Sequence, residues 1–189
     1  MPDFRVLFER APGLFLVLRP DRDFTILAAS DAYLRATLTQ REHIVGRGLF
    51  EIFPDNPDDQ SANATHNLRD SLQRALQQRA PDTMAVQKYD IRRPDSEGGG
   101  FEARYWSPVN TPIFAPDGEP LYLIHRVEDV TGYVQLSQQG AAMEREIVER
   151  SRELAAANAQ LREANERQAE LDRAKTAFFN NISHEFRTP

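Results

Sequence analysis

Hydrophobic residues cluster over short segments in the first two thirds of the chain and recur at heptad spacing in the last third. Apolar runs bounded by glycine, proline or aspartate predict strands over Leu14–Leu18 and Phe24–Ala29. Three more strands are predicted over Met84–Ile91, Phe101–Ile113 and Leu121–Val127. About five strands joined by short turns predict an antiparallel sheet.

Helical spacing of apolar residues predicts short helices that flank this sheet. The spacing occurs over Phe4–Phe8, Ala32–Leu38 and Leu68–Leu76. Thr39 and Glu42 have the spacing of a capping box, which predicts the start of another short helix at Thr39. Strands and separate helices together predict an α+β domain.

The strand predicted over Phe101–Ile113 alternates between apolar and polar residues. Its faces are Phe101, Ala103, Tyr105, Val109 and Ile113 on one side, and Glu102, Arg104 and Asn110 on the other. Proline has no N–H to donate, so Pro108 and Pro112 predict an edge or a bulge near the end of this strand.

The last third of the chain predicts one long helix. No proline lies between Pro120 and Pro189, and the last of the nine glycines is Gly140. Heptad positions a are Ile147, Leu154, Leu161, Gln168, Lys175 and Ile182, and positions d are Met143, Arg150, Ala157, Ala164, Leu171 and Phe178. Apolar residues fill most of these positions, which predicts a parallel coiled-coil dimer. The alternative is a surface helix that folds back on the globular domain.

Composition excludes several classes of protein. With 23 basic and 29 acidic side chains the net charge is −6, which argues against a nucleic-acid-binding face. The chain has no cysteine, which excludes disulfides, thiolate metal sites and a flavin–cysteinyl adduct. The longest apolar run, Leu14–Leu18, is far too short to cross a bilayer, and no signal-peptide pattern opens the chain. We therefore expect a cytoplasmic protein with no membrane segment.

The order of elements over Phe4–Tyr133 resembles that of a PAS sensor domain. Three motifs carry the resemblance: the turn Gly46–Pro54, the hairpin Pro116–Gly118 and the junction Val127–Thr131. The resemblance implies that Asp129 and Thr131 transmit a signal into the long helix. A structural alternative is that these side chains cap the helix, and both roles can hold together.

A second motif closes the chain. On a helical wheel, Phe178, Phe179, Ile182 and Phe186 form one apolar stripe, and His184 lies almost opposite. A histidine placed in this way is exposed, while its neighbours anchor the helix in a dimer. An adjacent carboxylate, Glu185, can accept a proton from one ring nitrogen and make the other a better nucleophile.

The run from Ser183 to Pro189 is similar to the H-box of sensor histidine kinases, with Phe186 where leucine is usual. The resemblance implies that His184 is the phosphorylation site, that Glu185 is its base, and that Thr188 helps place the water that hydrolyses the phosphorylated response regulator. It divides the chain into a PAS domain (1–132), a signalling coiled coil (133–174) and the start of the dimerisation and phosphoacceptor domain (175–189).

The resemblance also implies partners. A homodimer would transfer phosphate to the receiver domain of a response regulator. ATP and Mg²⁺ would bind in a domain that this chain does not contain, so the parent protein is expected to be a histidine kinase and the chain alone inactive. The alternative is a non-catalytic adaptor that dimerises through the coiled coil.

A haem-binding sensor is a further alternative. The candidate ligands are His43, His66 and His125. Each also has a simpler interpretation: His43 as a surface residue, His66 as a solvated residue at a helix start, and His125 as a hydrogen-bonded core residue. Tyr105 and Trp106 are candidates to line a pocket, although large aromatic residues more often belong to a core or an interface. The sequence does not identify the signal that the sensor domain receives.

Overall fold

The computed structural model describes residues 2–59, 62–93 and 98–185, and in the last helix it describes side chains as far as Thr176. Its contacts divide the chain into two units, Met1–Gln135 and Leu136–Pro189. The first unit is an α+β domain, as the sequence predicted. The second unit consists of the greater part of one helix, α6 (Thr131–Glu185), which confirms the prediction of a single long helix.

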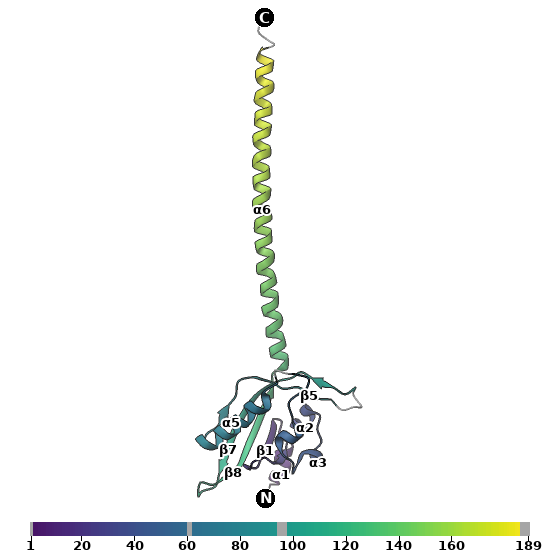
Figure 1. The fold of residues 1–189 in the computed structure, drawn as a ribbon, viewed down its shortest axis with the longest axis vertical. Coiled ribbons are helices and arrows are strands. Elements are labelled where there is room, and N and C mark those ends of the chain that lie inside the picture. The colour runs from purple at the N-terminus through teal and green to yellow at the C-terminus, as the bar shows by residue number, and fades with distance from the viewer. Residues whose placement is uncertain (1, 60–61, 94–97, 186–189) are drawn as a thin grey trace. The chain divides into compact units, whose positions relative to one another are not determined.

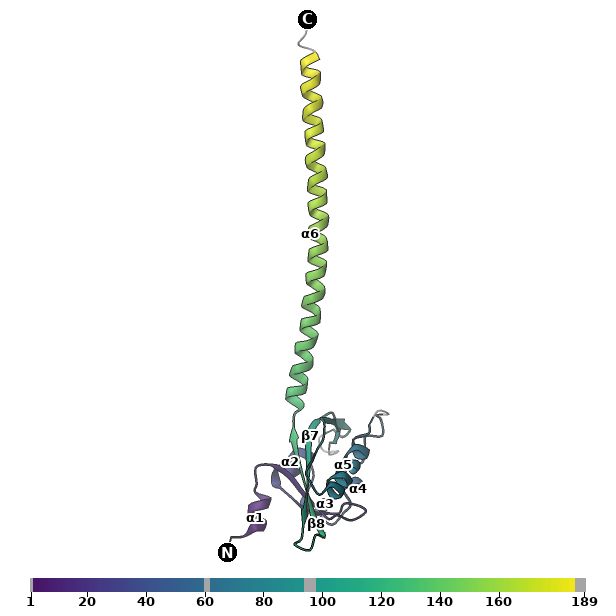
Figure 2. The same cartoon turned by 90° about the vertical axis from the view of Figure 1, so that its left-hand side faces the viewer.

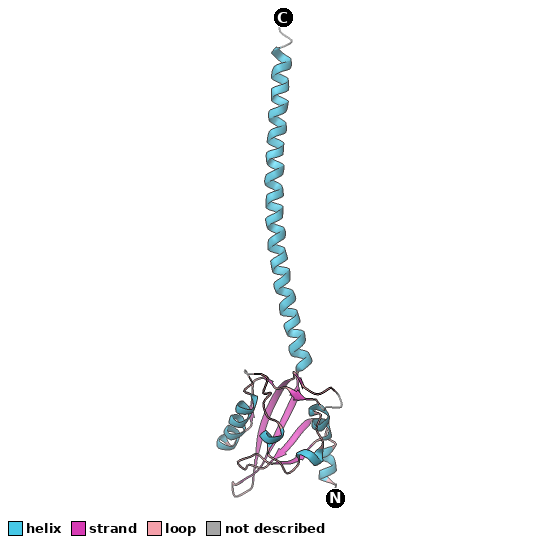
Figure 3. Ribbon diagram, turned by 45° about the vertical axis from the view of Figure 1, so that its right-hand side comes forward, coloured by secondary structure: helices cyan, strands magenta, loops and turns pink. Residues whose placement is uncertain are grey.

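An antiparallel sheet forms the centre of the first unit, with the strand order β2-β1-β8-β7-β3 and β4 also paired to β7 (Figure 3). Its strands are β1 (Leu14–Leu18), β2 (Ile26–Ala29), β3 (Asp82–Thr83), β4 (Gln87–Lys88), β7 (Tyr105–Phe114) and β8 (Pro120–Asp129). A separate pair consists of β5 (Ile91–Arg92) and β6 (Phe101–Glu102).

Among the described residues, five short helices accompany the sheet (Figure 1). They are α1 (Phe4–Glu9), α2 (Asp31–Thr37), α3 (Arg41–Ile44), α4 (Leu49–Ile52) and α5 (Ala64–Gln78). Figure 2 shows α1 on the opposite side of the strands from α4 and α5. On that outer side Phe8 packs against Phe15, with 6.4 Å between ring centroids.

The hydrophobic core lies between the inner face of the sheet and helices α2 to α5. Leu16, Leu18 and Leu123 point inward from the sheet and are fully buried. Leu49 and Leu72 meet them from α4 and α5. Burial of a leucine side chain stabilises a fold by about 2 kcal/mol, so these contacts fix the helices on the sheet.

The strand predicted over Met84–Ile91 is wrong in its extent, because the structure has short pairings there instead. β3 pairs with Val109 and Asn110, and β4 pairs with Tyr105 and Trp106. Between β3 and β4 the backbone N–H of Met84 donates to the carbonyl of Pro108. Pro108 has no N–H, so it cannot donate a second ladder hydrogen bond to this edge. The edge strand therefore breaks opposite this proline.

The inward face of β7 is also the reverse of the apolar face that the sequence predicted. Trp106, Pro108 and Asn110 are buried, whereas Val109 and Ile113 lie on the outer face. Alternation gives two faces but does not say which one the helices cover. Asn110 is accepted in the core because neighbouring side chains satisfy its amide.

The capping box predicted at Thr39 is wrong as well. The helix α3 begins at Arg41, its N-cap residue is Gln40, and no side chain caps it. The Thr39 hydroxyl lies 2.9 Å from that of Thr37 instead. The Thr39 hydroxyl therefore takes part in a different local hydrogen bond, with the last residue of α2, and does not cap α3.

Candidate functional site

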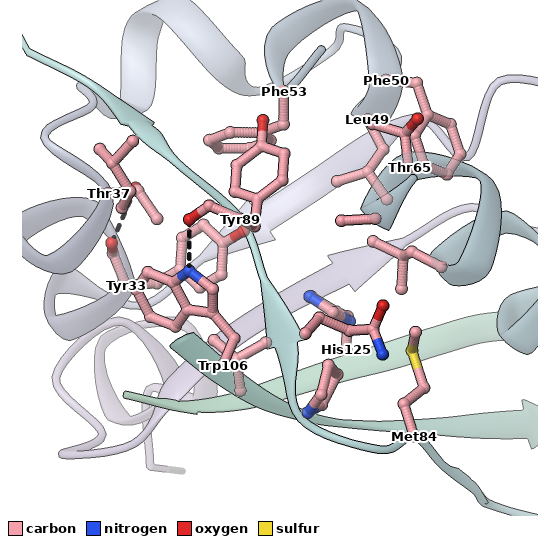
Figure 4. A pocket seen from close by; sticks show the side chains of 16 residues that line it. Tyr33, Thr37, Leu49, Phe50, Phe53, Thr65, Met84, Tyr89, Trp106 and His125 are labelled. Atoms are coloured by element: carbon pink, nitrogen blue, oxygen red, sulfur yellow. Dashed lines mark hydrogen bonds between the residues drawn. The ribbon is translucent and has the colours of Figure 1, made fainter. Parts of the chain in front are cut away.

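A cavity of about 70 Å³ lies in the first unit, between the sheet and the helices (Figure 4). Aromatic and aliphatic side chains make up most of its wall, with a few polar ones among them. The lining residues are Tyr33, Thr37, Leu49, Phe50, Phe53, Ala64, Thr65, Leu68, Met84, Gln87, Tyr89, Ile91, Trp106, Pro108, His125 and Val127. An apolar hollow with few polar groups is the usual form of a small-molecule site.

Most polar side chains of the wall already have partners within the protein. Thr37 donates to the Tyr33 carbonyl, Tyr89 to the Pro54 carbonyl, and the Trp106 indole to the Tyr89 carbonyl. The Thr65 hydroxyl donates to the carboxylate of Asp55, and the side-chain oxygen of Gln87 accepts from the amide of Asn67. Two polar groups of the wall have no such partner among the described residues: the Tyr33 hydroxyl and one nitrogen of His125.

A chain of hydrogen bonds leads from the cavity to the surface. His125 Nδ1 lies 2.7 Å from the amide oxygen of Asn110, and the Asn110 amide nitrogen lies 2.7 Å from Ser71 Oγ. Ser71 is 2.5 Å from Asp82, which accepts from the Arg74 guanidinium at 3.0 Å. The bond from Arg74, with that from Ser71, holds the pKa of Asp82 below its ordinary value.

Burial is the dominant influence on His125, whose side chain is 3% exposed. It lowers the pKa of this imidazole from 6.5 to about 4, so the ring is neutral near pH 7. This agrees with the sequence prediction of a hydrogen-bonded core histidine. The Tyr33 ring meets it edge-on, with 6.4 Å between centroids.

The depressed pKa of His125 predicts acid sensitivity. The unfolded chain takes up a proton below pH 6.5, whereas the folded chain does so only near pH 4, so stability falls as the pH drops between these values. We expect a loss of about 2 kcal/mol between pH 7 and 4.5. Denaturant unfolding followed by the fluorescence of Trp106, the only tryptophan, measures it. An equal loss in His125→Gln would contradict this assignment.

The other histidines proposed as haem ligands lie away from the cavity. His43 is exposed on α3, and His66 is exposed at the start of α5, 3.5 Å from Asp70. A volume of about 70 Å³ is well below the roughly 300 Å³ of a site for a drug-sized molecule. Neither a porphyrin nor a tricyclic flavin fits this cavity as it stands.

The junction between β8 and α6 is tied to the start of β7. Asp129 accepts the N–H of Thr131 at 3.0 Å and pairs with Arg104 at 2.7 Å. The Thr131 hydroxyl accepts the N–H of Tyr105 at 2.9 Å, and the N–H of Val130 donates to the Tyr105 carbonyl. Asp129 thus caps the helix, while Thr131 links it to the sheet.

The charge of Asp129 is stabilised at this junction. Partial burial raises its pKa, but the hydrogen bonds from Thr131 and from Arg104 outweigh that effect, so the pKa lies below its ordinary value. The carboxylate therefore stays ionised and keeps both the helix cap and the ion pair near neutral pH.

The motif that the sequence predicts to be a phosphoacceptor is described only in part. His184 and Glu185 belong to the last turn of α6 by their backbone, and their side chains lie outside the described residues. Thr188 lies outside them entirely. The predicted heptad seam is described further upstream, where Met143, Ile147, Leu154, Leu161 and Leu171 are 57–64% exposed in a single chain.

The described residues contain neither a metal-binding cluster nor a helix that could span a membrane. No group of histidine, aspartate or glutamate side chains there has the arrangement of a metal site. Every helix in this part of the chain is too short or too polar to span a bilayer.

Sequence reasoning missed the residues that connect the cavity to the surface. Ser71, Asp82 and Asn110 come from three separate elements, and only tertiary packing brings them together. One signal was available: Asn110 has the same parity along its strand as the large apolar side chain of Trp106. The sequence made both Trp106 and Tyr105 candidates to line a pocket. Trp106 lines the cavity, whereas Tyr105 is not part of the cavity wall.

Comparisons with known proteins agree with this architecture. A family model described as "PAS fold" matches residues 8–135. An RNA-binding light-oxygen-voltage receptor superposes with a TM-score of 0.55 at 16% identity, over 75% of this chain and 36% of the receptor chain. A PAS domain from Colwellia psychrerythraea superposes with a TM-score of 0.50 at 11% identity, over 67% of this chain and 93% of that domain.

These similarities concern the fold. This chain spans about a third of the receptor's length, and identities of 11–16% carry no information about ligand or activity. No curated protein matches the chain.

Proposed function

Because the chain belongs to the PAS-fold family, we propose that it is the sensory input and phosphoacceptor portion of a two-component histidine kinase. A signal received in the PAS domain passes along α6 to His184. One nitrogen of His184 attacks the γ-phosphorus of ATP, the bond to ADP breaks, and Glu185 takes the proton from the other nitrogen. The phosphoryl group then moves to an aspartate of a response regulator.

One observation carries this proposal: the Ser183–Pro189 motif begins in the last turn of α6, the helix that follows the last strand of the PAS domain. The helix α6 runs without interruption from Thr131 to Glu185. A rigid helix transmits a shift or a rotation from one end to the other, because its backbone hydrogen bonds oppose bending.

The exposed apolar seam of α6 supports a parallel dimer. In the part of α6 with described side chains, five large apolar residues at heptad positions face solvent in one chain, and pairing with a second copy would cover them. Such a dimer places two copies of the phosphoacceptor motif side by side. This arrangement would allow His184 to be phosphorylated and would allow the PAS domains to regulate that phosphorylation.

The junction supports a route for the signal. The backbone of Tyr105 holds both Val130 and Thr131, and Arg104 holds Asp129, so a shift of β7 moves the first turn of α6. Asp129 and Thr131 are the signal-transmitting residues of this proposal. Since the reaction uses ATP, we expect the protein to work in the cytoplasm.

The test supplies the ATP-binding domain of a histidine kinase in trans with γ-labelled ATP. We expect the chain to be labelled, and His184→Gln to reduce labelling at least 100-fold. His66→Gln is the matched control, since His66 is an exposed histidine on a helix of the PAS domain. Equal labelling of the two variants would refute the assignment of His184. A dimeric chain that takes up no label would favour the non-catalytic adaptor.

A further inference from the structure

The hydrogen-bond chain behind the cavity has a fixed direction. An ionised carboxylate only accepts, so the single hydroxyl proton of Ser71 points at Asp82. Ser71 Oγ then accepts from the amide nitrogen of Asn110, and the Asn110 amide oxygen faces His125. That oxygen needs a donor, so the ring proton of His125 sits on Nδ1.

The opposite nitrogen of His125 is therefore a hydrogen-bond acceptor. A neutral imidazole with its proton on Nδ1 has a lone pair on Nε2. Nε2 bonds to none of the described residues, and the ring lines the cavity, whereas Asn110 lies behind the cavity wall. An acceptor of a cavity-lining residue that has no partner among the described residues favours a guest that supplies a donor.

The rest of the wall restricts that guest. Phe50, Phe53, Met84 and Trp106 present apolar surface, and the described wall offers no free charged group to an ion. A volume of about 70 Å³ is about half that of an engineered cavity that accepts benzene. The guest is thus small, uncharged and mostly apolar.

We propose that the PAS cavity binds a small neutral molecule that donates one N–H or O–H hydrogen bond to Nε2 of His125. The inference deepens the proposed function, because it names the class of signal that this input domain receives. The Tyr33 hydroxyl, the second unpaired group of the wall, can donate to the guest or accept from it. The carboxylate of Asp82, at the far end of the hydrogen-bond chain, thereby sets the chemical preference of the cavity.

Pyrrole and furan test this proposal, because they are five-membered rings of similar size and only pyrrole has an N–H. We expect calorimetry on the full chain to give at least tenfold tighter binding of pyrrole. Long-range ¹H–¹⁵N spectra of histidine-labelled protein should show the His125 proton on Nδ1, and pyrrole should shift the Nε2 signal. The His125 signals are identified by their loss in His125→Gln.

Asp82→Asn tests the role of the carboxylate. A neutral amide can donate to Ser71 as well as accept, so both directions of the chain become available and both His125 tautomers are expected. The preference for pyrrole should fall below threefold. Asp70→Asn is the matched control, because it removes an exposed carboxylate from α5 and should leave the preference unchanged.

Three results would overturn the proposal: a proton on Nε2 in the unaltered chain, equal binding of the two rings, or binding of neither. The tautomer measurement does not use Asp82→Asn, so it decides even if that variant does not fold. Failure here leaves the kinase proposal intact, since labelling of His184 is measured without either ring.

Discussion

Asn110→Leu is expected to lower the free energy of unfolding of the PAS domain by about 3 kcal/mol. The amide is fully buried, and its loss leaves the Nδ1–H of His125 without an acceptor and removes a donor from Ser71. An unsatisfied buried polar group costs about 1–3 kcal/mol, and here two groups are affected. Denaturant unfolding followed by Trp106 fluorescence measures the change.

The matched experiment removes both partners of one bond. In the double variant Asn110→Leu, His125→Phe, no imidazole donor remains unpaired, so we expect at least 1 kcal/mol of the loss to be recovered. Additive losses in this double-mutant cycle would show that the two side chains are not coupled. They would contradict the hydrogen-bond chain described above.

Leu154→Asp is expected to raise the dissociation constant of the proposed dimer at least 100-fold. In a parallel coiled coil the two copies of this position a face each other, so the substitution places two carboxylates in one core layer. Burial of an unpaired charge costs several kcal/mol. Sedimentation equilibrium measures the effect.

A control on the same helix separates this effect from a loss of helix. Ala159→Asp introduces the same charge at position f, on the face opposite the seam, and should leave the dissociation constant within about threefold. Dissociation by both variants, or by neither, would count against the heptad register assigned here.

Several features of this protein follow from local sequence alone. The strand Leu14–Leu18 and the helices before β1 and around Leu72 match their predictions, because each depends on periodicity and turn residues that act over a few positions. The long helix was equally clear, since no proline or glycine interrupts it after Gly140. Heptad spacing and the motif around His184 are also properties of the sequence itself.

Other features needed the tertiary structure, because they depend on which distant groups meet. The break between β3 and β4 results from Pro108 on a neighbouring strand, and the inward face of β7 is set by the helices that cover it. The link from Asp82 through Ser71 and Asn110 to His125 joins residues up to 54 positions apart only after the sheet and α5 have packed. Periodicity identifies elements, whereas the identity of a buried polar partner is decided by packing.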